Sequence, residues 1–192
     1  MSPEFDAELA RFKDLAPREG RIAAFTFVRD ILYGDIGSRD PHDVLRVRKG
    51  TCSGKHALLK LFLEGLGYEV FTFFAKHGFS RFPIKPWPEV LAPFRTKTLT
   101  DYHAFLKVNV DGSWLTVDAI FDAGTKPLGF PVADWDGVSD MTLPVEAAEI
   151  FKAESEAEEQ KKSLIAALPE QVQKDRKAFL AALTSMLNTL RQ

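Results

Sequence analysis

Cysteine is almost absent from this sequence. The 192 residues include one, Cys52, so no intramolecular disulfide can form and a reducing compartment is indicated. The chain also lacks an apolar stretch of the roughly 20 residues needed to cross a membrane. Residues 1–15 carry acidic side chains and no apolar run, unlike a secretory signal. We therefore expect a cytoplasmic protein with no membrane partner.

The chain also lacks a large net charge of either sign. There are 25 Lys and Arg residues against 27 Asp and Glu residues, and no basic stripe that would predict a nucleic-acid partner. The longest charge run, 154–162, mixes both signs and predicts a solvated helix face. No glycine-rich phosphate loop or other motif indicates a cofactor. With 45% hydrophobic residues, the composition is that of an ordinary globular domain.

Hydrophobic periodicity predicts an α+β fold. Apolar residues at helical spacing predict helices over 4–16, 19–33, 41–48 and 52–66. Strands are predicted over 68–75, 103–110 and 113–120, and proline and glycine content predicts irregular connections over 76–100 and 121–144. We expect residues 1–144 to form one domain, with a cysteine-bearing helix packed on an antiparallel sheet.

The segment 145–192 predicts a helical C-terminal extension packed on the same domain. It is rich in Ala, Glu, Lys and Leu and is expected to form two helices broken near Pro169. Its regularly spaced apolar residues fit packing on the domain. They also fit a homodimer or partner face, and this alternative stays open.

Cys52 lies where a helix begins. Gly50 and Thr51 precede it, and Thr51 is a suitable N-cap residue. A thiol in the first turn of a helix has a lowered pKa, because the partial positive charge of the helix start favours the thiolate. A lone cysteine in a helix is otherwise usually a small buried apolar residue.

A hairpin supplies the partners that a thiol nucleophile needs. Asp111-Gly112 predicts a two-residue turn, so Val110 should pair with Ser113. In that register His103 and Asp118 lie on one face within side-chain reach, and the other face is apolar: Ala104, Leu106, Val108, Val110, Leu115, Val117 and Ala119. A shift of one residue would separate His103 from Asp118. Asp101 or Asp122 could then take the place of Asp118.

These residues predict a cysteine nucleophile. Cys52 would attack an acyl carbon, His103 would accept the thiol proton, and Asp118 would orient the imidazole. A weaker alternative is a zinc site built from Cys52, His56 and His103.

The order of these motifs resembles the transglutaminase-like superfamily, which is related to the papain-like cysteine proteases. The matching stretches are Gly50-Thr-Cys52 with its helix, the strand that begins at His103, and Ser113-Trp-Leu-Thr-Val-Asp118. The resemblance covers roughly residues 20–122. It implies a papain/transglutaminase-like core with Cys52 as nucleophile, His103 as base and Asp118 as orienting acid. It also departs from the family, since Phe105 stands where tryptophan is frequent.

The resemblance also suggests residues that bind substrate. Tyr33 resembles a family position just before the core, and Phe105 and Trp114 are expected on the same hairpin face as His103. The predicted function is thiol-dependent acyl transfer on a peptide or protein amide, by hydrolysis or transamidation, without metal or cofactor. The alternative is a non-catalytic binding module of the same fold that acts through protein–protein contacts.

Overall fold

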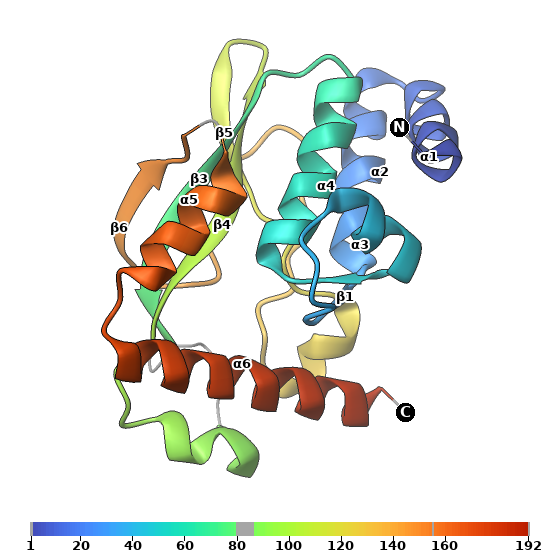
Figure 1. The fold of residues 1–192 in the computed structure, drawn as a ribbon. Coiled ribbons are helices and arrows are strands. Elements are labelled where there is room, and N and C mark those ends of the chain that lie inside the picture. The colour runs from blue at the N-terminus through green and yellow to red at the C-terminus, as the bar shows by residue number, and fades with distance from the viewer. Residues whose placement is uncertain (1, 80–86, 155, 192) are drawn as a thin grey trace.

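The computed structural model describes residues 2–79, 87–154 and 156–191. It contains helices on both sides of the chain's main antiparallel sheet, which confirms the predicted α+β class (Figure 1). The helices are α1 (Pro3–Lys13), α2 (Pro17–Asp30), α3 (Pro41–Val47), α4 (Cys52–Gly65), α5 (Ala157–Ala166) and α6 (Glu170–Leu190). The strands are β1 (Leu32–Tyr33), β2 (Lys49–Gly50), β3 (Val70–Gly78), β4 (Thr100–Val110), β5 (Ser113–Val117) and β6 (Ala147–Lys152), with 3₁₀ segments η2 (Glu89–Phe94) and η3 (Ala123–Leu128).

The hairpin of β4 and β5 has the predicted register. Val110 pairs with Ser113, and the turn residues Asp111 and Gly112 have φ angles of 51° and 86°, as the tight turn that matches strand twist requires. Most of the predicted apolar face lies in the core shared with α4: Leu106, Val108, Val110, Leu115, Val117 and Ala119. The second strand ends at Val117 rather than at residue 120, so Asp118 follows directly after the ladder.

Helix α4 packs on this apolar face. Its side chains Leu58, Leu59, Phe62 and Leu63 are fully buried, and they join the core that α1, α2 and β4 also line. The buried stripe therefore holds α4 against the sheet (Figure 1).

The prediction of helix from residue 145 onwards is wrong at its start. Residues 147–152 form the edge strand β6, which pairs antiparallel with β3. Phe151 packs on Phe74 with ring centroids 5.9 Å apart. Pairing with an open sheet edge outweighs the helical preference of alanine and glutamate in so short a segment.

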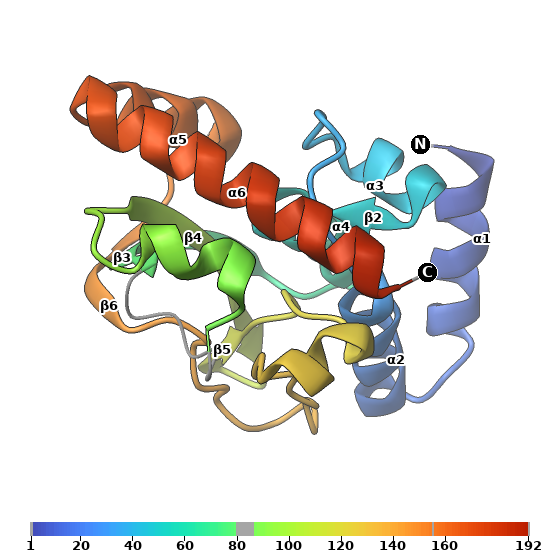
Figure 2. The same ribbon diagram turned by 90° about the horizontal axis from the view of Figure 1, so that it is seen from below.

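The C-terminal helices pack on the rest of the chain. In Figure 1, α5 lies over the sheet, and Figure 2 shows α6 crossing the molecule to the side of α2. The α6 residues Phe179, Leu183 and Leu187 are at most 1% exposed. They lie in the same apolar cluster as Cys52, so these three positions are not available to a second copy of the chain.

Two further features complete the fold. The connection predicted over 76–100 is partly regular, because β3 continues to Gly78 and η2 follows, while residues 80–86 of that connection lie outside the described residues. Of the helices described, none has the length and apolarity to span a membrane.

Candidate active site

Cys52 is the first residue of α4 and lies almost completely inside the protein, with 7% of its surface exposed. Thr51 occupies the N-cap position as predicted, but its side chain makes no capping hydrogen bond. Among the described residues its buried hydroxyl has no partner. The backbone amides of the first helical turn have no acceptor within the helix. Because the Thr51 side chain does not bond to them, they are left to interact with the Cys52 thiol or with a substrate.

His103 and Asp118 come together as the hairpin register predicted. Nε2 of His103 lies 2.5 Å from Oδ2 of Asp118, and both side chains are 2% exposed. The second carboxylate oxygen of Asp118 accepts a hydrogen bond of 3.1 Å from the amide of Ile120. The carboxylate is thereby fixed in orientation by the chain that leaves β5.

The two other aspartates considered for this role have different partners. Asp101 accepts a hydrogen bond of 2.9 Å from Arg176. Asp122 accepts one of 2.8 Å from the amide of Tyr33 and is also paired with Arg191. Asp118 is the carboxylate that is hydrogen-bonded to His103.

The Cys52 thiol and the His103 imidazole lie close enough for each to shift the pKa of the other. Since Nε2 of His103 faces Asp118, Nδ1 is the nitrogen left for the sulfur. Burial by itself raises the pKa of Cys52, but the charges of Lys161 and His103 outweigh it and hold that pKa well below its usual value. Burial likewise disfavours a charged His103, but Asp118 and Cys52 raise its pKa to about 10. The site therefore favours a thiolate beside an imidazolium near neutral pH.

His56 packs beside the site, with its Nε2 3.5 Å from Oδ1 of Asp118. Its Nδ1 lies 2.8 Å from the carbonyl oxygen of Cys52, and its Nε2 accepts a hydrogen bond of 3.0 Å from the amide of Ala119. The proton is therefore on Nδ1, and both ring nitrogens are used by the backbone. The zinc alternative needed a free nitrogen on His56, so it is not formed, and no group of three metal-binding side chains is found in the described part of the chain.

Lys161 of α5 is the site residue that sequence reasoning missed. Its Nζ lies 3.5 Å from the Cys52 sulfur and 3.1 Å from the Ser53 hydroxyl. It belongs to the charge run predicted to be solvated, yet it is only 7% exposed. The sequence did contain a signal that Lys161 is buried. Leu164 and Ile165 follow it by three and four residues, so all three lie on the apolar side of the helix.

The thiol opens into a small cavity of about 90 Å³. Arg39 and Glu158 line this cavity and also a wider open groove of about 700 Å³ between residues 35–41 and α5. The groove therefore adjoins the cavity at Cys52. The cavity is lined by Tyr33, Arg39, Thr51, Cys52, Ser53, Asp101, Glu158, Lys161, Ile165, Arg176 and Leu180.

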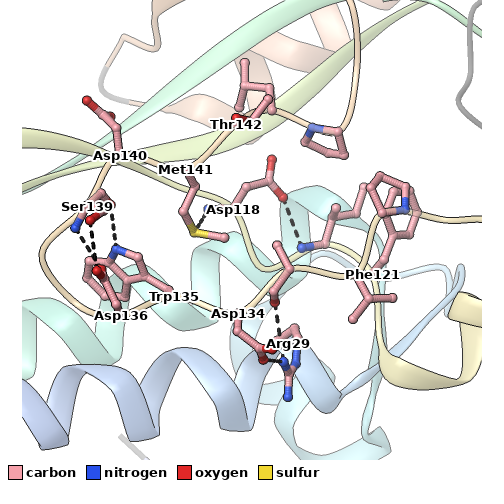
Figure 3. A pocket seen from close by; sticks show the side chains of 16 residues that line it. Arg29, Asp118, Phe121, Asp134, Trp135, Asp136, Ser139, Asp140, Met141 and Thr142 are labelled. Atoms are coloured by element: carbon pink, nitrogen blue, oxygen red, sulfur yellow. Dashed lines mark hydrogen bonds and ion pairs between the residues drawn. The ribbon is translucent and has the colours of Figure 1, made fainter.

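A cleft of about 500 Å³ lies on the other side of Asp118 (Figure 3). Asp118 and Met141 face it, and Arg29 is paired with Asp134 at its rim. Cys52 and His103 do not line it. Although this cleft is larger than the cavity at Cys52, it gives no access to the sulfur.

The three aromatic residues suggested for substrate binding lie in different places. Tyr33 lines the cavity at Cys52 and is 5% exposed. Phe105 is 1% exposed and packs in the cluster that contains Cys52. Trp114 is 40% exposed but pairs with Asn109, which is six residues along β4 from His103, or about 20 Å. The structure therefore brings Tyr33 to the site, buries Phe105 beside it, and leaves Trp114 far from it.

Comparisons with known proteins add little to this geometry. No protein-family model matches the chain, and no curated protein matches it. One solved structure that aligns with it is that of a candidate cysteine protease from Cytophaga hutchinsonii, with 15% sequence identity and a TM-score of 0.43. The alignment covers 79% of this chain and 51% of that protein, so the chain spans about half of its length. So low a likeness transfers neither a family nor an activity to this chain.

Proposed function

We propose that this protein is a thiol-dependent acyl-transfer enzyme that acts on amide bonds. The observation that carries the proposal is the buried arrangement at the start of α4, in which the Cys52 thiol lies beside His103 and His103 is hydrogen-bonded to Asp118. A nucleophile, a base and a group that orients the base are the minimum for covalent catalysis. The layout also matches what a transglutaminase-like relationship would imply for these three positions.

Each residue has a definite task in this reaction. The Cys52 thiolate attacks the carbonyl carbon of the amide. The His103 imidazolium gives its proton to the leaving amine, which produces a thioester and a neutral imidazole. Asp118 holds the ring in place and stabilises its charged form. We infer that the amide of Cys52, at the start of α4, donates to the oxygen that becomes negative.

Hydrolysis completes the cycle most simply. A water molecule gives a proton to the neutral His103 and adds to the thioester carbon, and the thiolate then leaves. An amine in place of water would give transamidation by the same steps. The substrate class is a peptide or protein amide, which we expect to approach along the groove beside Arg39 and Glu158.

The rate of Cys52 alkylation by iodoacetamide tests the proposal. Because the chain has one cysteine, intact-mass measurement reports this site alone. We expect rapid labelling well below the usual thiol pKa of about 8.5, and loss of this low-pH reactivity in His103→Ala. His42→Ala, on α3 and away from the thiol, is the matched control and should behave as the wild type.

The opposite result would overturn the proposal. Labelling that rises only near the pKa of a free thiol, and that is the same in His103→Ala, would mean that the imidazole does not activate the sulfur. Once activation is established, a peptide library incubated with and without methylamine separates hydrolysis from transamidation. The first adds water to the acyl product, and the second adds the amine.

One observation favours the alternative of a non-catalytic binding module. Cys52 is 7% exposed, and its cavity of about 90 Å³ is well below the roughly 300 Å³ of an ordinary ligand pocket. A peptide reaches the sulfur only if it inserts a narrow group or if α5 moves. An unreactive thiol in the labelling experiment would support this alternative.

A further inference from the structure

The ammonium group of Lys161 lies unusually deep for a lysine. The residue is 7% exposed, and within the described ranges no carboxylate lies at ion-pair distance from its Nζ. Its polar contacts are the Cys52 sulfur at 3.5 Å and the Ser53 hydroxyl at 3.1 Å. Burying a charge costs free energy unless a counter-charge compensates it. The nearest atom that can carry that counter-charge is the sulfur, and the Asp101 carboxylate interacts with Lys161 from farther away.

Other charged groups around the thiol have partners of their own, and burial lowers the pKa of the neighbouring His77 of β3 to about 4. From β4, His103 is paired with Asp118, and Asp101 is bonded to Arg176 of α6. The remaining ionisable groups that line the cavity are Tyr33 on β1, Arg39 in the loop before α3, and Glu158 on α5. Arg39 donates to Asp35 at 2.7 Å. Lys161 thus brings an ammonium group into contact with the Cys52 sulfur.

We propose that Lys161 is a catalytic residue of the acyl transfer, whose ammonium holds Cys52 as a thiolate and then binds the oxyanion formed at the substrate carbonyl. This inference rests on the proposed function. It adds a fourth group from the C-terminal helices, which lie outside the stretch that resembles the transglutaminase-like superfamily.

The charge moves over a short path in this reaction. When the thiolate attacks, a C–S bond forms, and the electron pair of the carbonyl π bond moves to the oxygen. The negative charge thus leaves the sulfur for an atom two bonds away. The flexible four-carbon stem of lysine lets the ammonium follow it. When the C–N bond breaks, the carbonyl is restored and the amine takes the proton of His103.

The charge balance around Lys161 favours its second role, which is to bind the oxyanion of the substrate. In the thioester the sulfur is neutral, so the positive charge of Lys161 is no longer compensated by its nearest partner. A new negative charge on the substrate oxygen restores the balance, and such stabilisation is largest in a buried site. The buried hydroxyl of Thr51, which has no partner among the described residues, lines the same cavity.

Packing holds Lys161 in place. One side of α5 rests on an apolar patch of the sheet formed by Phe74, Tyr102 and Ala104, with Leu164 and Ile165 packed against it. The ammonium is thus carried on a helix that packs on the sheet. The C-terminal segment is on this view a component of the active site.

Alkylation with two reagents of different charge tests the inference. Iodoacetate is an anion and iodoacetamide is neutral, so a cation beside the sulfur favours iodoacetate. In Lys161→Met we expect the pH midpoint of labelling to rise by one unit or more, which is about a tenfold loss of rate at low pH. The preference for iodoacetate over iodoacetamide should also fall several-fold. Lys161→Arg should keep both properties, since it keeps the charge.

Lys162→Met is the matched control. Lys162 is the next residue on α5, but its side chain is 61% exposed and paired with Glu159, so its loss should change neither property. The oxyanion task is tested with N-acetylglycinal, an aldehyde that forms a tetrahedral adduct with the thiol. Protection of Cys52 by this aldehyde should weaken at least tenfold in Lys161→Met.

The outcomes separate this inference from the proposed function. If His103→Ala abolishes the low-pH reactivity but Lys161→Met changes neither the midpoint, the reagent preference nor the aldehyde protection, then the role of Lys161 is refuted and the proposed function stands. If His103→Ala has no effect, the proposed function itself fails. Lys161→Gln, with a polar but uncharged head, carries the same test should the methionine variant not fold.

Discussion

Replacing Asp118 by asparagine removes the charge that faces His103 and keeps the size of the side chain. In the wild type both side chains are 2% exposed and 2.5 Å apart. Two unit charges about 4 Å apart at an effective dielectric constant of about 20 attract each other by about 4 kcal/mol. Loss of one member of a buried pair costs about 3–5 kcal/mol. We therefore expect the free energy of unfolding of Asp118→Asn to be about 4 kcal/mol below that of the wild type.

The pH dependence of this difference reports the charge states. The pKa of His103 is raised from 6.5 to about 10 in the folded protein, so its contribution to stability is complete below pH 6.5 and is lost as the pH rises towards 10. The pKa of Asp118 is lowered from 3.8, so its contribution is complete above that pH and is lost as the pH falls. The difference between wild type and variant should thus be largest between about pH 4 and pH 6.5.

Urea unfolding followed by circular dichroism at a series of pH values measures this difference. Asp111→Asn is the matched control, because Asp111 is in the exposed hairpin turn with a φ of 51°, where asparagine is well accepted. The control should leave the free energy of unfolding nearly unchanged at every pH. A deficit in Asp118→Asn that stays constant from pH 5 to pH 10 would refute the buried ion pair.

Two other substitutions test how the site is supported. Lys55→Met should lower the free energy of unfolding by about 3 kcal/mol or more in urea titrations. The Lys55 ammonium lies within 2.9 Å of the carbonyl oxygens of Arg29, Ile31 and Ile120, and the substitution leaves these acceptors without a donor. A loss below about 1 kcal/mol would contradict this. Phe179→Ala should cost about 3–5 kcal/mol, because the side chain is fully buried. It should also speed iodoacetamide labelling of Cys52, since α6 lines the cavity, and unchanged labelling would show that α6 does not limit access.

Local signals predicted the parts of the site that are close in sequence. The turn at Asp111 and Gly112 determines the hairpin register, and the register brings His103 to Asp118. The same alternation of apolar residues predicted the core face under α4. Gly50 and Thr51 marked the start of that helix, although the expected side-chain cap of Thr51 is absent.

The errors lie where distant parts of the chain meet. Residues 147–152 have a helical composition and became a strand because β3 offered an open edge. Trp114 shares a hairpin face with His103 but lies too far along it to reach Cys52. His56 has the spacing of a metal ligand but bonds to the backbone instead, because Ala119 lies beside it in the fold.

The sequence by itself therefore determined the type and order of most elements, the hairpin register and the residues able to act as nucleophile, base and acid. These depend on turn chemistry and on the period of apolar residues, which are local properties. Only the tertiary structure decided how deeply the thiol is buried and which cation faces it. Lys161 follows Cys52 by 109 residues, and no local pattern encodes a contact that arises from the packing of α5 on the sheet.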